Sequence, residues 1–330
     1  MQRFIVAHFG IEACTGASQV GPLPLVRRPG GPQRTIRSEG VSSGFASQDV
    51  RSLALLDAIW DEDTSASVHA EPPRIVCAPV EGLRGRYIDA VGGRQLLAFQ
   101  YAPFTLIKQS LRWEYGRQSP ASGLMPVHGV ILETLGRRVG ISARGQAGKS
   151  FLADTWLEAD ADARALVDDW SLVDPETRCI RRTGDAALHV RGSAWQRESA
   201  QLDGAERVLV ELCDGDPRSD ETRYLVDRSR LARFENASAG RTLDALVLVR
   251  EPRAEHFDLE DDAVAVRAAF EAEARTFWDD SLAGLPDAAV DYLHEAWSRV
   301  LAGMPIVVMR GHRGRAAEDV VQALRGALEV

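Results

Sequence analysis

The chain has 330 residues, of which 45% are hydrophobic and 26% charged, and its formal net charge is −9. This length exceeds one average domain, so we expect a lobe of roughly 100 residues and a larger one of roughly 200. The acidic balance excludes nonspecific binding to nucleic acid, whose phosphate backbone requires a surplus of Lys and Arg. No run approaches the roughly 18 apolar residues that a membrane span needs, and the first residues turn polar too early for a signal peptide. We therefore expect a cytoplasmic protein with neither a membrane nor a nucleic-acid partner.

Residues 1–123 have the pattern of a smaller, mostly β lobe. Short apolar runs separated by Gly and Pro are typical of strands joined by turns. The runs expected to form strands are 3–10, 74–80, 86–91 and 94–102. Apolar residues within 50–59 lie near helical spacing, and the polar segment 61–73 is expected to be a loop. A second helix is expected to start near Phe104 and to end at Trp113.

From residue 124 to residue 330 the order changes to strand, strand, glycine-rich turn, helix and strand, which is typical of a nucleotide-binding α/β domain. The elements expected first are strands at 127–133, 137–142, 165–169, 170–174, 178–182 and 187–192, with a helix at 149–159. The elements expected beyond residue 255 are helices at 259–282, 285–302 and 316–328, with a strand at 305–311. The apolar sides of the helices between residues 262 and 302 could pack within the chain or form the interface of a homo-oligomer.

Segment 143–150 carries the parts of a phosphate-binding loop. Such a loop needs glycines for close backbone approach, a Lys for the terminal phosphates and a Ser or Thr hydroxyl for Mg²⁺. The residues predicted to bind the nucleotide are Gly145, Gln146, Ala147, Gly148, Lys149 and Ser150. A helix that begins at Lys149 would add its positive end to this anion site. Ala143 stands where the pattern GxxxxGK[ST] begins with glycine, so we expect a slightly reshaped loop; the alternative is a chance GKS in a turn that starts a helix.

Two adjacent carboxylates follow the loop at the distance of one helix and a return turn. Asp168 and Asp169 close the segment 165–169, about twenty residues after Ser150, and are expected at the same sheet edge as the loop. One carboxylate can hold Mg²⁺ beside the phosphates, while the other accepts the proton of an attacking hydroxyl. The alternative is an acidic strand end that faces water.

Three arginines lie close together near the end of the chain. Arg310, Arg313 and Arg315 are separated only by small or polar residues. We interpret them as solvated surface, and binding of a phosphate or an acidic peptide is the alternative.

Three segments resemble the catalytic domain of HPr kinase/phosphorylase and its relatives. Their sequences are PVHGVILETLGRRVGISARGQAGKSFLA, ALVDDWSLVD and LHVRG. The resemblance covers residues 125–192 and implies a P-loop kinase core related in fold to phosphoenolpyruvate carboxykinase, preceded by the β lobe and followed by C-terminal helices. The early segment FIVAHFGIEA is similar to the N-terminal part of HPr-kinase-like proteins from peptide and natural-product gene clusters. The implied activity is that of a kinase that uses ATP (or GTP) and Mg²⁺.

The resemblance also implies roles for individual residues. Asp169 matches the catalytic base, and Asp168 is its neighbour on the metal side, where Ser150 is the second protein ligand. His128 occupies the position of the family's active-site histidine near the γ-phosphate. Arg191 matches the arginine of the family's LEIRG loop and would offset charge on the transferred phosphate.

Two departures from the family bear on the acceptor. His189 stands where the family has a glutamate that helps to hold Mg²⁺, and the segment after Gly192 does not reproduce the HPr kinase signature. The expected acceptor is therefore a hydroxyl of a precursor peptide, such as a lasso-peptide precursor, or of a small metabolite in a natural-product pathway. The alternatives are a serine or HPr-type protein kinase, a nucleotide-binding regulator without phosphotransfer, and a carboxykinase-like lyase.

Overall fold

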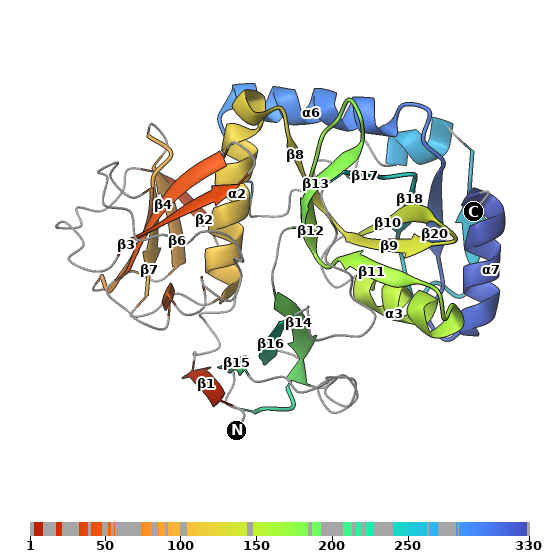
Figure 1. Ribbon diagram of the computed structural model, residues 1–330, viewed down its shortest axis with the longest axis horizontal. Coiled ribbons are helices and arrows are strands. Elements are labelled where there is room, and N and C mark those ends of the chain that lie inside the picture. The colour runs from red at the N-terminus through yellow and green to blue at the C-terminus, as the bar shows by residue number, and fades with distance from the viewer. Residues whose placement is uncertain are drawn as a thin grey trace. The chain divides into compact units, whose positions relative to one another are not determined.

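The chain is of the mixed α/β class, as predicted, and forms two compact units (Figure 1). The computed structural model describes residues 3–8, 18–21, 33–38, 41–47, 52–53, 56, 74–80, 83, 85–89, 92–99, 104–143, 148–183, 187–192, 207–212, 216–219, 222–227, 240–262, 264–269, 282 and 284–328. The first unit comprises Met1–Gln118, Asp185–Ala232 and Asp280–Pro286, and the second comprises Ser119–Gly184, Arg233–Asp279 and Asp287–Val330. The sequence suggests a single boundary at 123/124. The first unit also includes two later segments, and β15 of the segment Asp185–Ala232 pairs with β1, the first strand of the chain.

The first unit contains a six-stranded sheet and a four-stranded sheet. The six-stranded sheet has the order β2 (Ser18–Gly21), β6 (Gly85–Asp89), β7 (Gln95–Ala98), β5 (Ile75–Ala78), β4 (Val41–Ser47) and β3 (Gln33–Ser38). The four-stranded sheet has the order β1 (Arg3–His8), β15 (Arg207–Leu212), β16 (Arg223–Asp227) and β14 (Ala187–Arg191). Strands β5 and β7 are buried along their whole length, so they form the centre of the larger sheet.

Two predictions in the N-terminal part meet different outcomes. Ser52, Leu53 and Leu56 are helical, and the rest of the predicted helix at 50–59 lies outside the described residues, as does the predicted loop at 61–73. The predicted end of the next helix at Trp113 is wrong, because α2 runs over Phe104–Ser122. Trp113 is 1% exposed and packs in the middle of this helix.

The second unit is built on a six-stranded sheet. Its order is β11 (Arg164–Val167), β9 (Val130–Thr134), β10 (Arg137–Ala143), β18 (Ala245–Val249), β20 (Ile306–Arg310) and β19 (Asp258–Glu260). Strands β10, β18 and β20 are parallel to one another. Strand β9 is antiparallel to both β10 and β11, so β11 runs in the same direction as the parallel three. The C-terminal ends of β10, β11, β18 and β20 therefore lie along one edge of the sheet.

A smaller sheet of the second unit has the order β17 (Arg241–Thr242), β13 (Cys179–Thr183), β12 (Trp170–Val173) and β8 (Met125–His128). Between consecutive strands of the described chain, it passes from one of these sheets to the other three times: from β8 to β9, from β11 to β12 and from β17 to β18. The predicted single strand at 127–133 is therefore two strands, separated at Gly129. A Cβ on Gly129 would lie only 2.6 Å from the carbonyl oxygen of Ile141, so this crossing requires glycine.

Two helices cover one face of the six-stranded sheet. Helix α3 (Lys149–Ala159) matches the predicted bounds, and α7 (Ala317–Leu328) follows β20 and packs against α3. Alternate residues of β9, β10, β18 and β20 point toward these helices and make one buried apolar cluster with them. The cluster contains Val130, Leu132, Val139, Ile141, Leu152, Trp156, Val247, Val307, Val320 and Leu324. This packing fixes the start of α3 against the ends of the parallel strands.

The predicted helices at 259–282 and 285–302 differ in how far they are described. Residues 258–260 form β19, and 264–269 are helical, while 270–281 lie outside the described residues. Helix α6 covers Asp287–Leu301, and its apolar residues, including Leu293 and Trp297, are buried within the chain. No helix in the described part of the chain is both long and apolar enough to cross a membrane.

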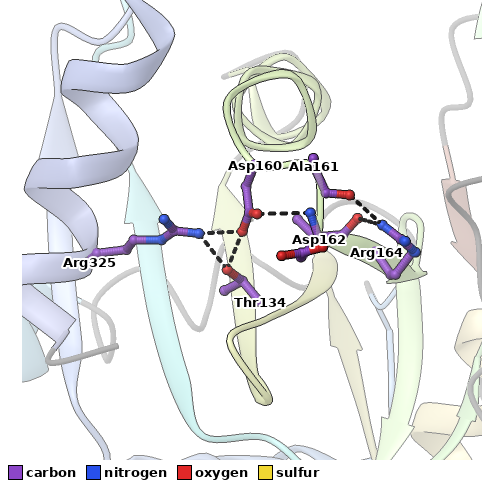
Figure 2. A network of polar contacts seen from close by, with 7 residues as sticks. Thr134, Asp160, Ala161, Asp162, Arg164 and Arg325 are labelled. Carbon is purple, nitrogen blue, oxygen red and sulfur yellow. Dashed lines mark hydrogen bonds and ion pairs between the residues drawn. The ribbon is translucent and has the colours of Figure 1, made fainter.

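A polar network ties the end of α3 to α7 (Figure 2). The Thr134 hydroxyl donates to Asp160 Oδ2 at 2.7 Å, and the Arg325 guanidinium pairs with the same carboxylate and donates to Thr134 Oγ1 at 3.0 Å. Burial by itself would raise the pKa of Asp160. The Thr134 hydroxyl, the amides of Asp162 and Ala163 and the charge of Arg325 outweigh it and hold the pKa below its ordinary value. The ionised carboxylate therefore clamps β9, α3 and α7 together.

Candidate functional site

The predicted site residues of the second unit gather at the edge where the parallel strands end. Lys149 begins α3 directly after the loop that leaves β10, and Asp168 follows the last residue of β11. His128 ends β8 at the crossing into β9, beside the same edge. In open α/β sheets, ligands bind outside the carboxyl ends of the strands, which makes this edge the candidate site.

Gly148 and Lys149 are the described end of the predicted phosphate loop and open helix α3. Gly148 precedes α3 with φ of 97°, a left-handed conformation that favours glycine. Its carbonyl accepts from the Leu152 amide at 2.9 Å, so the helix starts directly from it. Lys149 Nζ donates to the Ala143 carbonyl at 3.4 Å, which holds the ammonium at the end of β10. Gly145, Gln146 and Ala147 lie outside the described residues.

Ala143 occupies a position that the sequence pattern gives to glycine. It is the last residue of β10, pairs with Val249 in the parallel ladder and is fully buried. A side chain of one carbon thus fits inside the apolar cluster under α3. The departure from the pattern is accommodated within the strand.

His128 and Asp169 are in direct contact across the junction of the two sheets. His128 Nε2 lies 3.0 Å from Asp169 Oδ1, and the two side chains are 14% and 24% exposed. Because an ionised carboxylate only accepts hydrogen bonds, Nε2 must carry the proton. The backbone holds the pair on both sides: the Gly129 amide donates to the Asp169 carbonyl at 2.8 Å, and the Ser142 hydroxyl donates to the His128 carbonyl at 2.7 Å.

Asp169 has a backbone conformation that residues other than glycine rarely adopt. Its φ is 79°, in the left-handed region, between the end of β11 and the start of β12. Asp and Asn tolerate this region better than other residues do, at a cost of about 1 to 2 kcal/mol. Strain of this kind is concentrated at functional sites, where the surrounding structure enforces it. The strained residue here is the one predicted to be the base.

The predicted metal ligands lie at the same edge. Ser150 is in the first turn of α3 and exposed, and Asp168 is half-buried beside Asp169. Among the described residues, no three His, Cys, Asp or Glu side chains form a cluster that could hold a metal ion. Mg²⁺ keeps several waters and takes further ligands from substrate phosphates, so one hydroxyl and one carboxylate fit the protein's share of such a site.

Arg191 and His189 belong to the other unit. Both lie in β14, where Arg191 pairs with Arg223 and His189 pairs with Leu225 of the antiparallel neighbour β16. The predicted role of Arg191 beside the transferred phosphate stays a prediction.

His312 and Arg313, which sequence reasoning did not assign to the site, lie against Gly148, at the end of the predicted phosphate loop. They follow β20, and the position of a Cβ on Gly148 would be 3.3 Å from His312 Nε2 and 3.5 Å from an Arg313 terminal nitrogen. Both contact Phe151 of α3: the His312 ring centroid is 5.7 Å from the Phe151 centroid, and the guanidinium carbon of Arg313 lies 5.6 Å from it. The arginine cluster around Arg313 is the only signal in the sequence, and nothing local connects it to a loop more than 150 residues earlier.

The His312 imidazole is 2% exposed, and neither ring nitrogen has a hydrogen-bond partner among the described residues. Burial, together with the charge of Arg313, lowers the pKa of His312 from 6.5 to about 4. The ring is therefore neutral near pH 7, with one nitrogen able to donate and the other to accept.

No known family model matches this chain, and no curated protein sequence matches it.

Proposed function

We propose that this protein is a kinase that transfers the γ-phosphate of ATP, with Mg²⁺, to a hydroxyl of a peptide or small-molecule acceptor. The observation that carries the proposal is the shared sheet edge. There a left-handed glycine and a lysine open a helix after β10, and His128 at the end of β8 is hydrogen-bonded to Asp169 just after β11. A phosphate cradle and a strained carboxylate at one edge meet the two needs of phosphoryl transfer, which are charge neutralisation and orientation of the nucleophile.

Each residue has a defined part in this reaction. The Lys149 ammonium turns from the Ala143 carbonyl toward the terminal phosphates, while the start of α3 directs its amides at them. Asp169 orients the acceptor hydroxyl and takes its proton as the oxygen forms a bond to the γ-phosphorus. The bond between that phosphorus and the bridging oxygen then breaks, and ADP leaves.

His128 fixes the base. Its hydrogen bond to Oδ1 holds the carboxylate in one orientation, so that the other oxygen faces the acceptor. We assign His128 as a positioning residue.

Magnesium would be held by the Ser150 hydroxyl and the Asp168 carboxylate. When bound, it neutralises charge on the β- and γ-phosphates. The side chains of both residues stand at the helix start and strand end that form the candidate site.

The test separates nucleotide binding from transfer. ATP binding is measured by calorimetry, and transfer by incubating ATP labelled at the γ-phosphate with serine-containing peptides and with hydroxylated metabolites. Lys149→Ala should abolish both, whereas Asp169→Asn should keep ATP binding and lower transfer at least about a hundredfold. Asparagine keeps the tolerance for positive φ and can still accept from His128, so it changes only the basicity.

Asp162→Asn is the matched control, because Asp162 is exposed in the turn after α3 and should have wild-type transfer. Normal turnover by Asp169→Asn would show that Asp169 is not the base. ATP binding without labelled product for any acceptor would instead favour a nucleotide-binding regulator.

A further inference from the structure

The segment between β20 and α7 reaches the phosphate loop from a second direction. Because β10, β18 and β20 are parallel neighbours, the turn after β20 emerges at the edge where α3 begins. Gly311 starts this turn with φ of 65°, and a Cβ there would overlap the carbonyl of His256, so the turn is held tightly against its neighbour. The position of His312 and Arg313 next to Gly148 is thus fixed by the backbone.

Two observations at this turn indicate a ligand. The first is the His312 imidazole, which is 2% exposed with neither nitrogen hydrogen-bonded within the described part of the chain. A buried polar group without a partner is costly, and natural proteins keep few of them. The ring lies against Gly148, which places its nitrogens beside the predicted anion site.

The second observation is the Arg313 guanidinium. It lies over the ring of Phe151, the residue that follows Ser150 in α3. Its Nε is buried and has no hydrogen-bond partner among the described residues. Stacking on an aromatic ring orients a guanidinium and leaves its in-plane donors available for a phosphate. The first turn of α7 carries Glu318 and Asp319, which already complement its dipole. The side chains of the turn, and not the start of α7, are therefore the groups suited to contact an anion.

We propose that His312 and Arg313 bind the polyphosphate of the nucleotide held by the phosphate loop, Arg313 as a charge-assisted donor and His312 as a neutral hydrogen-bonding partner. This inference rests on the proposed function, because it assigns further ligands to the same nucleotide. The nucleotide would then be bound by Gly148 and the start of α3 and also by the turn before α7.

The test measures binding of ATP, inorganic tripolyphosphate and adenosine, each alone, by calorimetry. Arg313→Gln should weaken binding of ATP and of tripolyphosphate about tenfold or more and leave adenosine unchanged, and His312→Gln should weaken the same two by less. Arg315→Gln is the matched control: Arg315 is exposed two residues further on and donates to the Glu255 carbonyl. It should bind all three compounds as the wild type does.

A second measurement is made on the wild-type protein and uses a variant only to assign one signal. In the wild-type protein, tripolyphosphate should shift the imidazole resonances of His312 in a histidine-detected NMR spectrum, with the signal assigned by its loss in His312→Gln. If Arg313→Gln proves poorly folded, the milder variant Arg313→Lys replaces it in the binding assay. Arg313→Lys should retain part of the affinity for ATP and tripolyphosphate.

The outcomes separate the two proposals. If ATP and tripolyphosphate bind and Lys149→Ala abolishes this, while Arg313→Gln binds both normally and the His312 signal does not move, the inference is overturned and the proposed function stands. A loss confined to adenosine would also overturn it, since the turn would then contact the nucleoside. If the wild type binds neither ATP nor tripolyphosphate, both proposals fail.

Discussion

The buried imidazole of His312 should make the stability of the protein depend on pH in a calculable way. Burial and the neighbouring charge of Arg313 lower its folded pKa from 6.5 to about 4. The unfolded chain therefore takes up this proton as the pH falls below about 6.5, while the folded protein does so only near 4. A group whose folded pKa is lowered in this way destabilises the folded state as the pH falls. Its cost is absent above pH 6.5 and complete below about 4.

The size of the effect follows from the two pKa values. At about pH 5 the imidazole of the unfolded chain is almost fully protonated, whereas that of the folded protein is hardly protonated. This difference raises the unfolding equilibrium constant by a factor of about 30, which corresponds to about 2 kcal/mol. At about pH 7.5 the same term is close to zero. Other titrating groups also change with pH, so the quantity that isolates His312 is the difference in unfolding free energy between the wild type and His312→Gln.

The assay is urea unfolding followed by circular dichroism at about pH 7.5 and about pH 5. Relative to the wild type, His312→Gln should gain about 2 kcal/mol on going to the lower pH, whatever its stability at the higher one. If the free-energy gap between the two proteins is the same at both pH values, the imidazole is not held neutral by burial. The description of His312 as an unpartnered buried group would then be wrong.

Three further predictions concern stability. Asp160→Ala should cost about 2 kcal/mol in unfolding free energy, because it leaves the partly buried guanidinium of Arg325 unpaired, whereas Glu176→Ala, which breaks an exposed ion pair, should cost much less. Gly129→Ala should cost about 1 to 3 kcal/mol and reduce phosphotransfer as well, since the added carbon cannot fit at the crossing between sheets. Leu135→Asn should raise the melting temperature and Leu135→Val should lower it: Leu135 is exposed, with φ of 49°, in a two-residue hairpin turn that favours asparagine before glycine. Thermal melts of each variant beside the wild type test the changes in stability, and the labelled-ATP assay tests the loss of phosphotransfer. An unchanged melting temperature of Asp160→Ala, Gly129→Ala or either Leu135 variant would contradict the corresponding prediction.

The sequence predicts the centre of the second unit well because local signals agree there. The bounds of α3 are correct, since Gly148 stands directly before the helix and a regular apolar spacing follows it. The helix expected to end at Trp113 continues to Ser122. The prediction ended it too early because α2 buries polar residues, among them Ser110, Glu114 and Ser119. Buried polar residues interrupt the apolar periodicity on which helix prediction depends.

The residues of the candidate site also differ in whether local sequence patterns could identify them. Asp169 and the residues at the start of α3 are identified by short-range patterns, and their common sheet edge follows from the strand–helix–strand order. The 3.0 Å contact between His128 and Asp169 depends on how two sheets meet, and local spacing does not encode this. His312 was missed for a stronger reason: it reaches Gly148 only because β18 and β20 add to the sheet in parallel, far along the chain.

The parallel pairing of β10, β18 and β20 also has a consequence for how the chain is made. During synthesis, the hairpin of β9 and β10 leaves the ribosome long before its neighbour β18 at 245–249, and longer still before β20 at 306–310. Until then the open edge of β10 and the apolar side of α3 stay uncovered, which favours capture by chaperones and association between nascent chains. A ribosome-bound fragment ending before residue 306 should therefore be protease-sensitive at α3, and one that has released residue 328 should be protected.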